Sequence, residues 1–121
     1  MGKVTAIFGA SPNKTRYSNI AANMLREYKH EVVPLGLRKG EIADTEIKTD
    51  WPKHIENLDT ITMYVGAPRQ PDHYAYLLGL KPKRIIFNPG AENPELAGLA
   101  TIQGIEVVEA CTLVMLRTGQ F

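Results

Sequence analysis

The residues best suited to chemistry lie in GASPNKTRYSN, residues 9–19, between a short apolar run and a segment of helical spacing. Gly9 permits a sharp turn and a close approach of a ligand to the backbone. Lys14 and Arg16 carry positive charge and donors for phosphate oxygens, and Ser11 adds a hydroxyl group. The free amides and dipole at the start of the following helix also favour an anion. The loop therefore predicts a phosphate site; a strand-to-helix turn with solvated cations is the alternative.

This loop lacks the glycine pattern of a dinucleotide site. In GxGxxG the first, third and sixth positions are glycine, whereas here they are Gly9, Ser11 and Lys14. An NAD site also places an acidic residue after the second strand, where it binds the ribose 2′-hydroxyl. This chain has Arg38 and Lys39 there. These cations suit a phosphorylated ribose, as in NADP or coenzyme A (CoA), unless they are solvated loop charges.

Short apolar runs alternate with longer amphipathic segments along the chain. The expected strands span residues 4–8, 31–35, 60–65, 84–87 and 105–108. The expected helices span residues 17–28, 50–58, 71–80 and 93–102, followed by a short helix or irregular tail at 111–117. This alternation predicts an α/β fold, namely a three-layer Rossmann-like domain with a mostly parallel five-stranded sheet and helices on both faces.

Candidate capping residues precede or begin three of these helices. Ser18 or Asn19 is expected to cap the first helix, and Asp50 the second. Asn93 followed by Pro94 is a third N-terminal signal. In an open parallel sheet, ligands bind beyond the carboxyl ends of the strands. The candidate site residues are therefore expected in segments 9–19, 34–40, 66–71, 88–92 and 109–112.

Composition narrows the class of protein. The chain has 121 residues, enough for one domain with a core, and we expect a single domain over 1–121. A formal net charge of +1 gives no global electrostatic case for nucleic acid. No segment is apolar enough to span a membrane, and a single cysteine excludes an internal disulfide. A cytoplasmic protein that binds neither nucleic acid nor membrane is expected.

The order of these motifs resembles the small single-domain CoA-binding proteins, whose domain is related to the nucleotide-binding domain of succinyl-CoA synthetase α-subunits. VTAIFGASPNKTRYSN resembles the first strand and GAS loop of that family, and EVVPLGL its second strand. RIIFNPGAENPELAGLATIQGIEVVEAC resembles its fourth strand, glycine turn, helix and last strand. The chain departs from the family after the second, third and fourth strands, where it has Gly36-Leu37, a displaced Arg69 and Asn88-Pro89-Gly90.

The resemblance implies that the cofactor is coenzyme A and that its site is spread over the strand ends. Backbone groups of residues 9–11, with Lys14, would bind the diphosphate, and Arg38 or Lys39 the ribose phosphate. Gly66 and Arg69 would border the cleft where the pantetheine leaves. The full set of expected cofactor-binding residues is Gly9, Ala10, Ser11, Pro12, Lys14, Tyr17, Ser18, Asn19, Pro34, Leu35, Arg38, Lys39, Gly66, Arg69, Asn88 and Gly90, with Pro34 and Leu35 as an apolar wall and Asn88 and Gly90 on the far side.

Catalytic and metal-binding patterns are absent from the sequence, which contains no Ser/His/Asp order, HExxH or cysteine–histidine metal spacing. Of the three histidines, only His73 is expected near the cleft, and Cys111 is expected near the last strand end. We therefore expect a CoA-binding protein without catalytic residues, either a sensor or a partner of a CoA-dependent enzyme. An NAD(P)-binding regulator or small reductase, a non-catalytic subunit of an acyl-CoA ligase, and a chain that has lost its ligand are the alternatives. A protein partner or a homo-oligomer is compatible with each.

Overall fold

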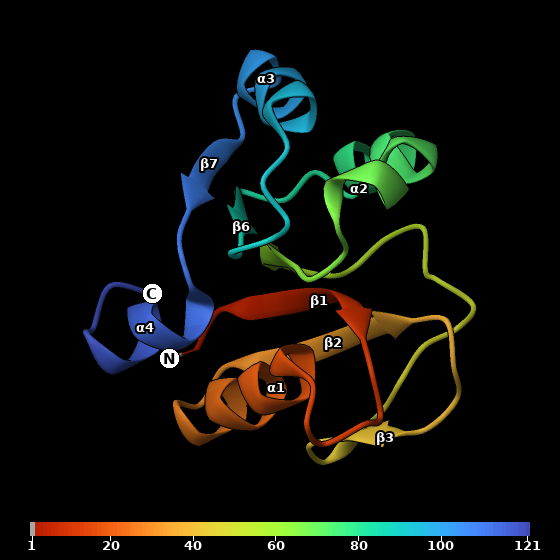
Figure 1. The fold of residues 1–121 in the computed structure, drawn as a ribbon, viewed down its shortest axis with the longest axis vertical. Coiled ribbons are helices and arrows are strands. Elements are labelled where there is room, and N and C mark those ends of the chain that lie inside the picture. Colours follow the sequence, from red (N-terminus) through yellow and green to blue (C-terminus); the bar gives the residue numbers. More distant parts are fainter. Residues whose placement is uncertain (1) are drawn as a thin grey trace.

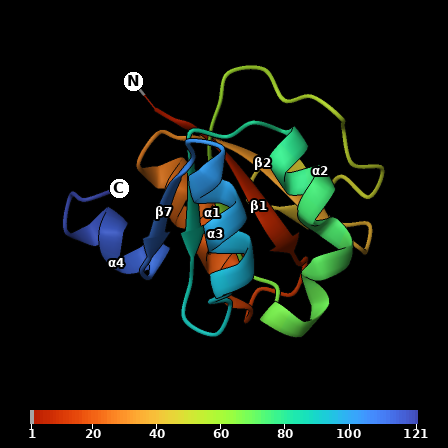
Figure 2. The same cartoon turned by 90° about the horizontal axis from the view of Figure 1, so that it is seen from above.

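A computed structural model describes residues 2–121 and contains a five-stranded parallel sheet of order β2-β1-β5-β6-β7. The strands are β1 (Val4–Ala10), β2 (Glu31–Gly36), β5 (Leu58–Met63), β6 (Arg84–Phe87) and β7 (Glu106–Glu109). Helices α1 (Tyr17–Glu27) and α4 (Thr112–Arg117) cover one face, and α2 (Tyr74–Gly79) and α3 (Pro94–Ile102) cover the other (Figures 1 and 2). This confirms the predicted three-layer, Rossmann-like α/β fold.

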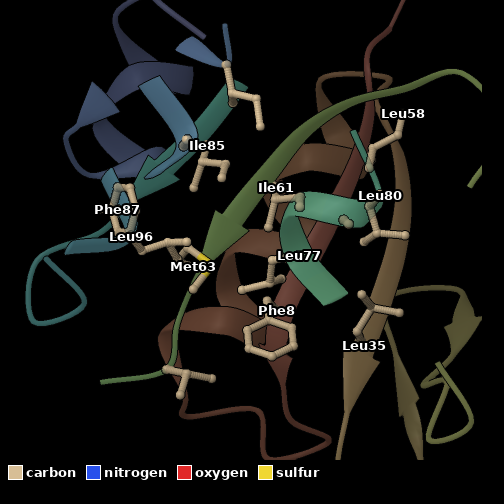
Figure 3. Close-up of a cluster of buried hydrophobic side chains, with 14 of the residues drawn as sticks. Phe8, Leu35, Leu58, Ile61, Met63, Leu77, Leu80, Ile85, Phe87 and Leu96 are labelled. Atoms are coloured by element: carbon tan, nitrogen blue, oxygen red, sulfur yellow. The ribbon is translucent and has the colours of Figure 1, made fainter. Parts of the chain in front are cut away.

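The two faces of the sheet carry separate hydrophobic clusters because successive strand residues point in opposite directions. Ile7 packs with Ala22 and Leu25 of α1. Its neighbour Phe8 belongs to the larger cluster with Leu77 of α2 and Leu96 of α3, which Figure 3 shows. These strands are buried on both faces, which explains their nearly continuous apolar sequences.

β1 is the position at which the strand order reverses. The chain passes from β1 to its neighbour β2 on one side and later returns to pair β5 with the other side of β1. Both pairings are parallel, so the carboxyl ends of all three strands meet at one edge of the sheet. Connections that leave such a switch point in opposite directions open a crevice beyond the strand ends.

The predicted helix over residues 50–58 is wrong, because residues 50–57 form turns and loops. Tertiary contacts override its helical spacing. The Trp51 indole Nε1–H donates to the Gly36 carbonyl oxygen at 3.0 Å, Ile55 is buried in the larger cluster, and Asn57 has a positive φ of 59°. The loop places Trp51 beside the end of β2.

A small hairpin between β2 and β5 was not predicted. It consists of β3 (Glu41–Ile42) and β4 (Thr45–Glu46), which pair antiparallel. Ile42 and the adjacent Ile47 are buried in the cluster on the α1 face. Two-residue strands carry too little alternation to be recognised from sequence.

The helix ends agree with the sequence at α3 and differ at α1. The Asn93 side chain accepts hydrogen bonds from the amides of Glu95 and Leu96 at 3.1 and 3.2 Å, so it caps α3 as predicted. The predicted cap of α1 by Ser18 or Asn19 is wrong, because the N-cap is Arg16, whose side chain makes no capping bond.

α2 is preceded by 3₁₀ turns at Ala67–Arg69 (η1) and Pro71–His73 (η2). No helix within residues 2–121 has the length and apolar character needed to cross a bilayer.

Candidate functional site

A cleft of about 630 Å³ opens at the carboxyl ends of β1 and β5. Its walls come from the loops that follow strands β1, β2, β5 and β6, together with Trp51 from the loop before β5. The lining residues include Gly9–Asn13, Arg16–Ser18, Leu35–Arg38, Trp51, Met63–Gly66, Arg69, His73 and Pro89–Ala91. The cleft therefore lies at the switch point of the sheet, where the strand order predicts a ligand.

Gly9 fixes the close approach of the ends of β1 and β5. Its φ is +99°, a conformation that residues with a side chain rarely adopt. A Cβ atom at this position would lie 2.9 Å from the Val65 Cγ2 atom and 3.0 Å from the Tyr64 carbonyl oxygen. Glycine is thus required both by the backbone conformation and by the space available, and it opens the turn that leads to α1.

The loop after Gly9 is held by its own polar side chains. The Asn13 amide donates to the Ser11 Oγ atom at 3.1 Å, and the Thr15 amide donates to the Asn13 Oδ1 atom at 3.0 Å. The buried Asn19 side chain donates from Nδ2 to the Ser11 carbonyl oxygen at 2.9 Å. These bonds fix the conformation of the loop.

The first amides of α1 remain available for an anion. Within the described part of the chain, the backbone N–H groups of Tyr17 and Ser18 have no hydrogen-bond partner, and both residues line the cleft. The first turn of α1 contains no acidic residue that would compete with an anion. A helix start of this kind stabilises negative charge through its amides and its dipole.

The arginine side chains that line the cleft give it a positive charge. Arg16, Arg38 and Arg69 line the cleft, and no aspartate or glutamate does so among residues 2–121. None of these three guanidinium groups forms a salt bridge with, or donates a hydrogen bond to, a described residue. The cleft thus concentrates positive charge in a chain whose formal net charge is only +1. Such a lining attracts a ligand that carries several negative charges.

An aromatic group covers the end of β1 on the α2 face. The ring centroids of Phe8 and Trp51 are 5.1 Å apart, and the His73 ring lies 5.3 Å from Phe8 and 5.2 Å from Trp51. All three residues line the cleft. Trp51 and His73, which pack on the buried Phe8, provide an aromatic surface beside the cationic groups. Aromatic side chains with a few polar groups are typical of sites for small molecules and cofactors.

Tyr64 also lines the cleft, but its phenol is not suited to act as a general base. Burial raises the pKa of its phenol to about 12, although hydrogen bonding to Thr112 and Thr62 partly offsets this effect. The phenol is therefore neutral near pH 7 and acts as a hydrogen-bonding group. Within the described residues no cluster of histidine, cysteine, aspartate or glutamate could hold a metal ion.

The far wall of the cleft is built on the amide side chain of Gln70, which is fully buried. Its Nε2 group donates to the carbonyl oxygens of Val65 at 2.8 Å and Ala91 at 2.9 Å. Its Oε1 atom accepts a hydrogen bond from the Asn93 Nδ2 group at 2.9 Å. One side chain thus joins the end of β5, the loop after β6 and the cap of α3. The sequence contained no local signal for this role.

Most of the expected cofactor-binding residues meet in the cleft: Gly9, Ala10, Ser11, Pro12, Tyr17, Ser18, Leu35, Arg38, Gly66, Arg69 and Gly90 line it. Five do not. Lys14 and Asn19 lie along a separate groove on α1, Pro34 is buried within β2, and Lys39 is exposed outside the lining. Asn88 is buried, and its amide is already bonded to the Thr62 Oγ1 atom, the Met63 carbonyl oxygen and the Thr112 amide.

Several lining residues were missed in the choice of site residues. Leu37, Pro89 and Ala91 lie within the segments expected after the strands, but they were not among the residues chosen as cofactor-binding. The sequence pattern places Trp51 in a helix, and only the tertiary fold brings it to the cleft. Cys111, expected near the site, is half-buried at the N-cap of α4 and is not part of the lining.

The parallel sheet, its reversal at β1 and the cleft at that point define a doubly wound α/β protein of the ligand-binding class. Residues 3–117 match the model of the family described as a CoA binding domain. The chain belongs to this family, which confirms the resemblance found in its motifs. Among curated proteins, none matches the chain.

Solved structures share the fold over nearly the full length. A crystal structure of an uncharacterized protein is 46% identical, covers 100% of this chain and 99% of its own, and has a TM-score of 0.96. The structure of cell-free ID.343 from Thermus thermophilus is 24% identical with a TM-score of 0.84, covering 99% of this chain and 91% of its own. A hypothetical protein from Pyrococcus horikoshii OT3 is 21% identical with a TM-score of 0.84, covering 97% and 83%. The last two likenesses concern the fold alone.

Proposed function

We propose that the cleft binds coenzyme A through its 3′-phospho-ADP moiety and that the chain is a CoA-binding module, a sensor or a partner of a CoA-dependent enzyme. The observation that carries this proposal is the lining of three arginines without a carboxylate at the switch point of the sheet. Membership of the CoA binding domain family supports the same ligand.

The diphosphate of CoA would bind at the start of α1. The free amides of Tyr17 and Ser18 supply donors there, and the Arg16 guanidinium supplies charge. Gly9 keeps the adjoining backbone free of a side chain, so phosphate oxygens can approach the loop closely.

The ribose 3′-phosphate would pair with Arg38, which follows β2 and is exposed in the cleft. An unphosphorylated ribose calls for an acidic residue at this strand end, and the lining has none within residues 2–121. This charge pattern favours CoA over NAD. NADP shares the ribose phosphate and is the competitor that experiment must separate.

We propose a binding role without catalysis because the cleft offers few groups for proton transfer. Tyr64 holds its proton at neutral pH, and His73 is the one histidine among the lining residues that the structure describes. His30 lies at the opposite end of the sheet, where its ring packs on Phe121, and His54 is exposed.

Binding can be followed directly through Trp51, the single tryptophan of the chain, which lines the cleft. We expect CoA to change its fluorescence and to raise the thermal unfolding midpoint, because a ligand that binds only the folded state stabilises it. CoA, dephospho-CoA, NADP, NAD and ADP are titrated in parallel. Tighter binding of CoA than of the other ligands supports the proposal, whereas a response to NADP without one to CoA rejects it.

If Arg38 binds the ribose phosphate, loss of its charge should weaken the binding of CoA. The Arg38→Gln variant is expected to bind CoA about tenfold or more weakly, since a charge-assisted phosphate contact is worth roughly 1.5–3 kcal/mol. Dephospho-CoA lacks this phosphate, so its affinity should change by less than about twofold. Isothermal titration calorimetry of both ligands measures the difference.

The matched control for Arg38→Gln is Arg117→Gln, which makes the same chemical change at an exposed residue at the end of α4, outside the cleft lining. It should leave both affinities unchanged. If Arg38→Gln weakened the binding of CoA and of dephospho-CoA equally, Arg38 would not bind the 3′-phosphate.

A further inference from the structure

If CoA binds as proposed above, its phosphates pair with two of the three guanidinium groups of the cleft, and Arg69 has no anionic partner. The inference drawn here about Arg69 rests on that proposed function. Arg16 accounts for the diphosphate and Arg38 for the ribose phosphate. The rest of CoA, from the diphosphate to the sulfur atom, carries no charge. Arg69 nevertheless lines the same cleft, exposed, and has no acidic partner among the described residues.

The fold places Arg69 on the opposite wall from Arg38. Arg38 follows β2 and Arg69 follows β5, and these strands flank β1 on its two sides. Neighbouring strands are about 4.8 Å apart, so the two strand ends are separated by roughly 10 Å. A ligand that binds its phosphates beyond β1 and β2 must extend past Gly66 and Arg69 to occupy the remaining wall.

The backbone at Arg69 is fixed independently of any ligand. Arg69 ends the 3₁₀ turn η1, and its amide donates to the Gly66 carbonyl oxygen at 3.0 Å. The next residue, Gln70, is fully buried and bonded to the loops on both sides. The guanidinium is therefore presented from a rigid rim, which lowers the entropy cost of engaging a ligand.

We propose that Arg69 binds a carboxylate at the end of the acyl group of an acyl-CoA thioester. The ligands of this cleft are then CoA thioesters of dicarboxylic acids. A guanidinium suits this role because its planar donors pair with both oxygens of a carboxylate. Among residues 2–121, no aspartate or glutamate lines the cleft, so no protein carboxylate of the lining competes with the ligand for Arg69.

The test uses malonyl-, succinyl- and glutaryl-CoA, each paired with the acyl-CoA of the same carbon chain that lacks the terminal carboxylate. Calorimetric titration of the full chain should show a preference of about tenfold or more for at least one dicarboxylic thioester over its uncharged counterpart. In the Arg69→Gln variant this preference should disappear. The affinity for CoA and for the uncharged thioesters should fall by much less than the affinity for the preferred dicarboxylic thioester.

Arg38→Gln serves as the contrasting variant, since it should weaken every CoA ligand while preserving the ratio between charged and uncharged thioesters. Equal binding of both members of every pair by the unaltered chain would overturn the inference and leave CoA binding intact. An equal loss for CoA and all thioesters in Arg69→Gln would also overturn it, by placing Arg69 at the nucleotide. Failure of CoA itself to bind would reject the proposed function, and this inference with it. An unchanged unfolding midpoint of unliganded Arg69→Gln confirms that the variant is folded.

Discussion

Replacing Gly9 with alanine is expected to lower the free energy of unfolding by about 3 kcal/mol. The backbone at this residue has a φ of +99°, which an alanine adopts only with strain. The added Cβ atom would also lie 2.9 Å from the Val65 Cγ2 atom and 3.0 Å from the Tyr64 carbonyl oxygen. The carbonyl belongs to the backbone at the end of β5, so relief of the contact requires the strand ends to separate.

The matched control for Gly9→Ala is Gly98→Ala, within α3. A Cβ atom there meets nothing within 4 Å, and alanine is a better helix former than glycine by about 1 kcal/mol. Gly98→Ala should therefore leave stability unchanged or raise it, in urea unfolding followed by Trp51 fluorescence. If both alanines had the same effect, the proposed contact between the ends of β1 and β5 would not control stability.

The fold was predictable because its strands are short, nearly continuous apolar segments separated by amphipathic ones. β1, β2, β5 and β6 were each located to within about two residues, and Asn93 with Pro94 marked the start of α3. Prediction failed at residues 50–58, where Trp51 and Ile55 show helical spacing, but separate tertiary contacts bury Ile55 and partly bury Trp51. The spacing of apolar residues in a short segment does not show whether those residues reach the core as part of a helix or as part of a loop.

At two residues of the candidate site the backbone conformation leaves a mark on the sequence. Gly9 and Gly90 have positive φ angles, and glycine after a strand indicates such a turn. Lys14 and Arg16 are close in sequence, yet only Arg16 lines the cleft. The direction of a loop side chain depends on turn geometry, here the bonds among Ser11, Asn13 and Thr15, which composition does not reveal.

Gln70→Leu is expected to cost about 3 kcal/mol of unfolding free energy, because leucine has a similar size but no hydrogen-bonding groups. The substitution leaves the carbonyl oxygens of Val65 and Ala91 without the Gln70 donor, and the Asn93 Nδ2 group without the Gln70 acceptor. These groups lie at a fully buried position, where an unmade hydrogen bond costs about 1–3 kcal/mol. Gln103→Leu, at the exposed end of α3, makes the same change and should stay within about 0.5 kcal/mol of the unaltered chain.

Gln70→Glu tests these hydrogen bonds directly. A carboxyl group can donate a hydrogen bond only when it is protonated, so the stability of the variant should depend on pH. In this variant the protonated carboxyl group can donate to one of the two carbonyl oxygens that Gln70 Nε2 now contacts and still accept from Asn93. An ionised carboxylate would instead face those carbonyl oxygens in a buried site, so its folded-state pKa should lie above the unfolded value of about 4.3. The stability of this variant relative to the unaltered chain should therefore be greatest below about pH 4.3 and should fall as pH rises through the raised folded-state pKa. A stability difference from the unaltered chain that stayed constant from about pH 4 to about pH 8 would show that the side chain at this position does not face the two carbonyl groups.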